Sequence, residues 1–247
     1  MKQIYADILK AKQANRKLLA ILLDPDKIDR KNLDALANKI NFSPATHVFI
    51  GGSHVLSTDL DHIISELKKK CSLPMVLFPG NPSQISTLAD GILFLSLISG
   101  RNPDYLIGHQ VKAAPILKKS ELEIIPTGYI LIESGTTTAV EKVSQTKPLS
   151  DLKEILHTAL AGELMGQQLL YLEAGSGAEN AVSVEIIKRI SQNIGIPLIV
   201  GGGIKTSRGI DDAYHSGADL VVIGTAFEND PDFFDKIFQN LEFEPEE

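Results

Sequence analysis

The sequence has 247 residues, of which 43% are hydrophobic and 22% are charged, and its net charge is −7. This composition is typical of a globular protein, and α/β barrels of about this length form one domain. An acidic chain without a basic, aromatic-rich stripe is not expected to bind nucleic acid. No apolar stretch approaches the roughly 20 residues that span a bilayer. The single cysteine, Cys71, cannot form an internal disulfide, which favours a cytoplasmic location.

Short apolar runs rich in Val, Ile and Leu recur along the whole chain. Such runs are shorter than typical helices and lack the alternation of a half-exposed strand, so they indicate strands buried on both faces, as in a parallel sheet. They occupy residues 18–23, 46–51, 74–78, 91–97, 125–132, 168–173, 197–201 and 220–224.

Helical patterns lie between several of these runs. They cover residues 57–70, 148–165, 180–194 and 207–217. Strand and helix alternating eight times predict a single (β/α)₈ TIM barrel over residues 1–247, with the acidic end 242–247 frayed. Only about a dozen residues separate the third and fourth strands, so a helix there must be short. A doubly wound open sheet is the alternative.

Glycines follow the last strands of this predicted barrel. In a barrel the carboxyl ends of the strands form the active face, and phosphate often binds in the loops after strands 7 and 8. Glycine allows a close approach of the backbone to a ligand. A phosphate monoester site is therefore predicted at Gly202, Gly203, Gly224 and Thr225, with the loop at Ser176 and Gly177 closing it. The alternative is that these glycines only make tight turns.

Polar side chains follow other strands. Asp24 comes after the first strand, Ser53 after the second, and Glu173 ends the sixth. Oxygen ligands suit Mg²⁺, which keeps several waters and bridges to substrate phosphates. Asp24 and Ser53 could supply such a site, although either residue could instead be a helix cap. His54 and His109 are interpreted as loop or packing residues.

Six motifs together resemble a known family. They are "LLDPDK", "GGSHVL", "SGRNPDYLIGHQ", "YLEAGSGA", "GGGIKT" and "GTAFE", in that order between about residues 15 and 228. They are similar to the geranylgeranylglyceryl phosphate synthases and the related bacterial heptaprenylglyceryl phosphate synthases. The heptaprenyl-type enzymes carry a lysine where this chain has Leu22, so the chain looks more like the archaeal-type group. The stretch 134–148 departs from the glycine- and aromatic-rich loop of archaeal members.

The resemblance implies a TIM barrel that joins a polyprenyl diphosphate, geranylgeranyl by this grouping, to the C3 hydroxyl of sn-glycerol 1-phosphate, with Mg²⁺ as cofactor. By motif, Asp24 and Ser53 match the metal site. Tyr171, Glu173, Gly175 and Gly177 match the glycerol phosphate loop, with Gly202, Gly203, Gly224 and Thr225 holding the phosphate. The family also implies a homo-oligomer, and a lipid product implies peripheral membrane contact.

The formation of an ether bond to a polyprenyl group explains why these residue types would be needed. A carboxylate at Glu173 can accept the hydroxyl proton as the ether bond forms, and a bound phosphate fixes that hydroxyl beside the base. The polyprenyl tail needs a long apolar groove, for which Phe78, Leu97 and Tyr129 are plausible lining residues.

Three other functions compete with this hypothesis. A sugar phosphate isomerase or aldolase could use the same phosphate loops, but a Schiff-base aldolase needs a lysine within a late strand, and none of the eight expected strands contains one. A flavin barrel could also reuse these loops, but the chain is short for one and the Mg²⁺-type residues would have no role. A non-catalytic phosphate- or lipid-binding barrel would not need Asp24, Ser53 and Glu173 together.

Overall fold

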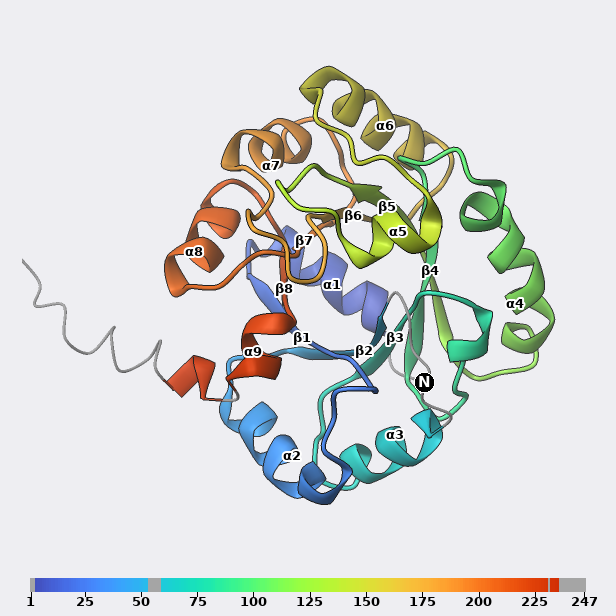
Figure 1. Cartoon of the computed structure of the whole chain (residues 1–247), viewed down its shortest axis with the longest axis vertical. Helices are drawn as coiled ribbons and strands as arrows, with labels where there is room; N and C mark the ends of the chain where they lie inside the picture. Colours follow the sequence, from blue (N-terminus) through green and yellow to red (C-terminus); the bar gives the residue numbers. More distant parts are fainter. Residues whose placement is uncertain (1–2, 53–58, 231, 236–247) are drawn as a thin grey trace, which may run out of the picture.

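Eight parallel strands form a closed barrel in the computed structural model, which describes residues 3–52, 59–230 and 232–235. Each strand pairs with the next along the chain, and the eighth pairs with the first, for example Leu18 with Leu220 (Figure 1). The predicted TIM barrel is confirmed and the open sheet is wrong. The strands are β1 (Leu18–Leu23), β2 (His47–Gly52), β3 (Met75–Pro79), β4 (Gly91–Leu97), β5 (Glu123–Leu131), β6 (Leu169–Glu173), β7 (Leu198–Gly201) and β8 (Leu220–Ile223).

The strands are apolar throughout because each one serves two cores. In β1, Leu19, Ile21 and Leu23 pack outward against the helices. Leu18 and Ala20 point into the barrel interior with residues of the other strands. Successive strand residues face opposite sides of a sheet, so a strand with apolar material on both sides reads as an unbroken run.

Helices surround the barrel, and several begin later than the sequence pattern suggested. The helix expected from 148 starts at Leu152, because the Asp151 carboxylate accepts the backbone N–H of Glu154 at 2.7 Å and caps it. The helices are α1 (Ile4–Gln13), α2 (Leu33–Phe42), α3 (Leu60–Lys68), α4 (His109–Leu117), α5 (Ala139–Ser144), α6 (Leu152–Leu164), α7 (Val184–Ser191), α8 (Ser207–His215) and α9 (Thr225–Asn229). There are also two 3₁₀ turns, η1 (Arg30–Asn32) and η2 (Pro82–Gln84), and a π-helical segment, η3 (Asp104–Gly108).

The connection between β3 and β4 contains no α-helix. Its only helical element is the three-residue turn η2, and the next full helix is α4, which η3 precedes. The short interval noted in the sequence therefore leaves the side of the barrel between α3 and α4 without a covering helix (Figure 1).

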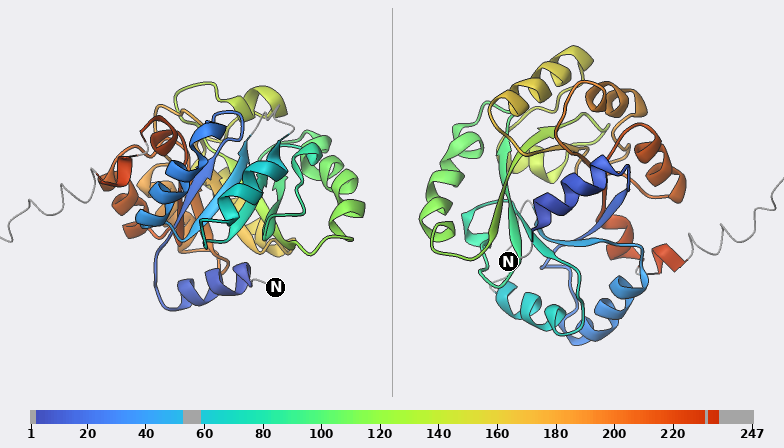
Figure 2. Two further views of the ribbon diagram at one scale, coloured as in Figure 1. Left: turned by 90° about the horizontal axis from the view of Figure 1, so that it is seen from below. Right: turned by 180° about the vertical axis from the view of Figure 1, so that it is seen from behind.

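Helix α1 covers the end of the barrel where the strands begin (Figure 2). Its residues Ile4, Ile8 and Ala11 are buried against the barrel interior. The Glu123 carboxylate at the start of β5 accepts the N–H groups of Ile4 and Tyr5, at 2.6 and 2.9 Å. This helix was not among the predicted elements. Among the described residues, every helix is too short or too polar to cross a bilayer.

Candidate active site

An open cavity of about 1210 Å³ lies at the carboxyl ends of β6, β7, β8 and β1. We call it the polar cavity. Every site residue predicted from the sequence lines it, except Ser53, which lies outside the described residues together with His54 and the tail 242–247. The predicted residues that line it are Asp24, Tyr171, Glu173, Gly175, Ser176, Gly177, Gly202, Gly203, Gly224 and Thr225.

Glu173 is the most deeply buried of the carboxylates that line the polar cavity. It ends β6, and only 5% of its surface is exposed. Burial raises its pKa to about 7, against the opposing effects of the Gly175 N–H and of the nearby Tyr171 and Tyr129 hydroxyls. The Gly175 N–H donates to Oε1 at 2.5 Å. A carboxylate whose pKa lies near neutral pH is suited to exchange a proton during turnover.

Two tyrosines lie beside this carboxylate, and their rings form a cluster with Phe78. The Tyr171 ring lies 5.3 Å from both the Phe78 and the Tyr129 ring centroids. Burial, followed by the Glu173 charge, raises the pKa of both tyrosines well above the ordinary value, so both stay protonated. The Tyr171 hydroxyl is buried beside Glu173 but makes no hydrogen bond of standard geometry with any described residue. Its interaction with Glu173 lowers the pKa of that carboxylate, and both groups line the polar cavity, where a bound oxygen would meet them together.

The glycines of the β6 and β7 loops have conformations that other residues rarely adopt. Gly175 has φ +105° and Gly202 has φ +81°. A Cβ at Gly202 would also collide with the Glu173 carboxylate, and one at Gly175 with the side chain of Thr138. These residues must be glycine for the two loops to close on each other. A branched residue at Gly202 would damage this packing as well as any ligand contact.

The β8 loop differs, although it faces the same cavity. Gly224 has φ −111°, and a Cβ there would contact only the Leu22 side chain, at 3.6 Å. The Ser176 and Thr225 hydroxyls lie 3.3 Å apart, which brings the β6 and β8 loops together at the rim. Lys205, an exposed residue after β7, also lines the cavity and adds a positive charge. Hydroxyls, glycine backbone and a lysine suit a phosphate group.

Asp24 belongs to a charge cluster where the loop after β1 meets α9. Its Oδ1 accepts the N–H of Asp26 at 3.1 Å within a turn, so it does not cap a helix. The Lys27 ammonium lies 3.6 Å from Asp24 and 2.8 Å from Glu228. Burial acts to lower the pKa of Lys27, but the hydrogen bond and charge of Glu228, with Asp24, outweigh it and raise that pKa. Lys27 is therefore a firmly charged cation at the cavity wall.

The donor set at Asp24 fits Mg²⁺. The described residues contain no cluster of three or more His, Cys, Asp or Glu side chains that could hold a metal ion alone. Mg²⁺ is commonly bound by one or two carboxylates together with substrate phosphates, so such a cluster is not required. Asp24 and Glu228 both line the cavity, although the two Glu228 oxygens already accept from the Asp24 N–H and from Lys27.

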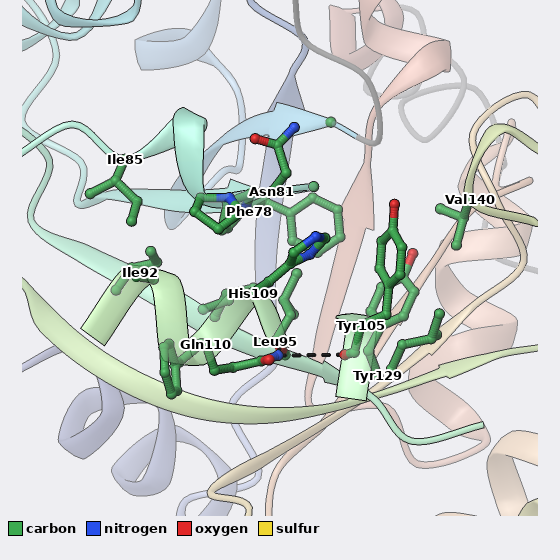
Figure 3. Close-up of a pocket in the computed structure, with 18 of the residues that line it drawn as sticks. Phe78, Asn81, Ile85, Ile92, Leu95, Tyr105, His109, Gln110, Tyr129 and Val140 are labelled. Atoms are coloured by element: carbon green, nitrogen blue, oxygen red, sulfur yellow. Dashed lines mark hydrogen bonds between the residues drawn. The ribbon is translucent and has the colours of Figure 1, made fainter. Parts of the chain in front are cut away.

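A second cavity of about 750 Å³ opens where the helix between β3 and β4 is missing. We call it the apolar cavity. Figure 3 shows Phe78 and Tyr129 on its barrel side, with His109 and Gln110 projecting from α4. Leu97 lines it as well, so the three residues expected to line a prenyl groove meet at one apolar cavity, and their contact with a prenyl tail stays a prediction. The Gln110 amide donates to the Leu95 carbonyl, while its Oε1 has no partner among the described residues.

The two cavities adjoin each other. Gly52, Phe78, Tyr129 and Val140 line both of them. Glu173 lies beside Tyr129, on the polar side of this boundary. The buried carboxylate therefore lies in the polar cavity, next to its boundary with the apolar cavity.

Known proteins with sequences similar to this chain agree with this arrangement of the site. The profile of the PcrB family matches residues 9–241. The chain belongs to the PcrB family. The geranylgeranylglyceryl phosphate synthase of Flavobacterium johnsoniae is 64% identical over 234 residues, which span 94% of this chain and 96% of that protein. The protein of the same name from Zunongwangia profunda is 49% identical over 231 residues, spanning 93% and 98% of the two chains.

A solved structure is similar throughout as well. The crystal structure of (S)-3-O-geranylgeranylglyceryl phosphate synthase from Thermoplasma acidophilum, in complex with its substrate sn-glycerol-1-phosphate, superposes with a TM-score of 0.90. It is 32% identical and covers 98% of both chains. The resemblance stated from six motifs is thus confirmed for this PcrB-family chain over nearly its whole length.

Segment 134–148 of this PcrB-family chain, whose sequence departs from the archaeal pattern, contains α5. Thr138 caps that helix and packs against Gly175. Val140 and Val143 line the apolar cavity. The segment thus joins both cavities.

Three charged site residues were missed from the sequence. Lys27 and Glu228 stand inside motifs that were recognised, "LLDPDK" and "GTAFE", yet lie 201 residues apart, so their pairing has no local signal. Lys205 stands inside a third recognised motif, "GGGIKT". The motifs could therefore have indicated these residues as site residues. The pairing of Lys27 with Glu228 is visible only in the closed barrel.

Proposed function

We propose that this chain is a Mg²⁺-dependent prenyltransferase of the geranylgeranylglyceryl phosphate synthase type. It would join geranylgeranyl diphosphate to the C3 hydroxyl of sn-glycerol 1-phosphate and release diphosphate. The observation that carries this proposal is that the polar and apolar cavities adjoin at Phe78 and Tyr129, with Glu173 beside the boundary. An isomerase of small sugar phosphates would have no use for the apolar channel.

In this proposal the glycerol phosphate occupies the polar cavity. Its phosphate would lie among the backbone of Gly203 and Gly224 and the hydroxyls of Ser176 and Thr225, which line the rim. Oriented backbone N–H groups and hydroxyls are a common phosphate site after the seventh and eighth strands of a barrel. The C3 hydroxyl then points toward Glu173, and the Tyr171 hydroxyl beside that carboxylate would help to orient it.

The chemical step exchanges one C–O bond for another. The bond between C1 of the prenyl group and the diphosphate oxygen breaks, and its electron pair leaves with diphosphate. The C3 oxygen of glycerol phosphate supplies the pair for the new ether bond, and its proton passes to a Glu173 oxygen. A pKa of about 7 leaves a large fraction of Glu173 ionised and able to accept that proton at neutral pH.

Asp24 is the residue we propose to hold Mg²⁺, with Glu228 on the same wall and Ser53 from the β2 loop as further candidates. When bound, the metal would neutralise the charge on the leaving diphosphate. Lys27 lies between the two carboxylates and would add a second positive charge near the same group.

The prenyl tail would lie in the apolar cavity, from the ring cluster of Phe78 and Tyr129 outward to α4. The missing helix between β3 and β4 makes room for it. Burial of each methylene contributes about 0.8 kcal/mol, so a tail of this length needs such a channel.

The test is direct. The purified protein is incubated with Mg²⁺, geranylgeranyl diphosphate and radiolabelled sn-glycerol 1-phosphate, and the lipid is extracted. We expect label in the lipid phase with sn-glycerol 1-phosphate and far less with the mirror-image sn-glycerol 3-phosphate. Equal labelling from both, or none from either, would contradict the proposal.

A further inference from the structure

The outer face of η3 and α4 combines exposed apolar and basic side chains. Ile107, Val111 and Ile116 are 59%, 63% and 48% exposed. Lys112, Lys118 and Lys119 are exposed beside them and form no ion pair with a described residue. We call these six residues the α4 face. Figure 1 shows α4 on the outside of the barrel, next to the side that lacks a helix.

The charge of this segment differs from that of the chain. Residues 105–120 contain three lysines and no carboxylate, whereas the whole chain carries a net charge of −7. Asp104 and Glu121 stand only at its two ends. A basic, partly apolar helix face is complementary to an anionic lipid surface.

The inner side of the same helix lines the apolar cavity. His109, Gln110 and Ala113 of α4 face Asn81 and Ile85 of the β3–β4 connection across its outer end. Figure 3 shows His109 and Gln110 on this side. A tail bound in the cavity therefore ends next to the α4 face, where a bilayer could receive it.

We propose that the α4 face docks on an anionic lipid bilayer, with Ile107 and Val111 inserted and the three lysines at the headgroups. This inference rests on the proposed function, because a prenylated glycerol phosphate must leave the apolar cavity for a membrane. A second copy of the chain fits the face less well. A two-fold interface places the same patch on both partners, so it would bring unpaired lysines toward lysines.

Vesicle co-sedimentation of the full chain tests the proposal without substrates. We expect binding to phosphatidylcholine vesicles that contain about 40% phosphatidylglycerol, weaker binding in 0.5 M salt, and little binding to pure phosphatidylcholine, because salt screens the attraction. The paired change Lys112→Gln and Lys118→Gln should weaken binding roughly 25-fold, about fivefold for each lysine. The pair Ile107→Ser and Val111→Ser should weaken it about tenfold.

Matched controls are available on other helices. Leu164 and Met165, at the end of α6, are 87% and 75% exposed, and Leu164→Ser with Met165→Ser should leave binding unchanged. Lys153→Gln with Lys188→Gln, on exposed positions of α6 and α7, controls for charge. Equal loss in the controls, or wild-type binding by the α4 variants, would overturn the proposal.

Two further measurements separate this inference from its alternatives. Turnover of soluble geranyl diphosphate should be unchanged in the α4 variants, since none of the changed residues lines either cavity. If the wild-type protein turns over substrate but does not bind anionic vesicles, only the docking inference is contradicted. If it binds vesicles but shows no turnover, only the proposed function is contradicted. Dissociation of an oligomer by the α4 substitutions would assign the face to a second copy and overturn membrane docking.

Discussion

The polar and apolar cavities of this barrel are built in different ways. The wall of the polar cavity at β6 and β7 is backbone, with glycines such as Gly175 and Gly202 held at positive φ so that two loops can approach each other. The apolar cavity is built from ordinary side chains and exists because a helix between β3 and β4 is absent. The polar cavity thus depends on particular residues at particular positions. The apolar cavity depends instead on the absence of a helix between β3 and β4. Each prediction below perturbs one cavity and spares the other.

The largest effect is expected from Glu173→Gln in the polar cavity. Glutamine keeps an oxygen for the Gly175 N–H but cannot take up a proton, so turnover should fall about 10²- to 10⁴-fold. Glycerol phosphate binding, measured by calorimetry, should be retained. In wild type, kcat/KM should rise with pH through about 7 as Glu173 ionises, and the variant should lack this limb. A variant that retains the limb would show that another group is the base.

The same carboxylate should make stability depend on pH. Its pKa is raised from 4.5 to about 7 on folding, so between these values the unfolded chain releases the proton while the folded chain keeps it. The stability of wild type relative to Glu173→Gln should therefore fall as pH rises from 4.5 to 7 and level off above. At about 1.4 kcal/mol per pKa unit the change is up to about 3 kcal/mol. Thermal melts of both proteins at pH 5 and 8 measure it, and parallel melts would contradict the raised pKa.

Asp24→Asn addresses the diphosphate side of the polar cavity. Asparagine can still accept the Asp26 N–H and preserve the turn, but it removes the charge offered to a metal. The Mg²⁺ concentration for half-maximal activity should rise about 10- to 100-fold, a loss of the size seen when metal sites are disturbed. Asp26→Asn, on an exposed neighbour, is the matched control. Equal Mg²⁺ midpoints in all three proteins would remove Asp24 from the metal site.

Ala113→Leu perturbs only the apolar cavity. Ala113 is buried where α4 lines that cavity, so the larger side chain fills space proposed for the far part of the tail. KM for geranylgeranyl diphosphate should rise about tenfold and KM for geranyl diphosphate should change little, because overpacking costs about 1–3 kcal/mol. Ala114→Leu, at the exposed neighbouring position, controls for the helix. A similar rise for both substrates would place the tail elsewhere.

The sequence by itself determined the strands and most of the glycines and hydroxyls of the polar cavity. A strand buried on two faces must be apolar at every position, as β1 is, and such runs are readable without any partner. Glycines at positive φ are likewise a local requirement, which is why Gly175, Gly177, Gly202 and Gly203 could be assigned to loops before the barrel was known.

Tertiary structure alone decided the rest. Closure of β8 on β1 brings Glu228 to Lys27 and Asp24, because only a closed sheet makes the first and last strands neighbours. The apolar cavity exists because the connection between β3 and β4 contains no α-helix. The sequence showed only that a helix there must be short. The pKa of Glu173 depends on burial among β5, β6 and β7, since desolvation is a property of the assembled surroundings rather than of the residue.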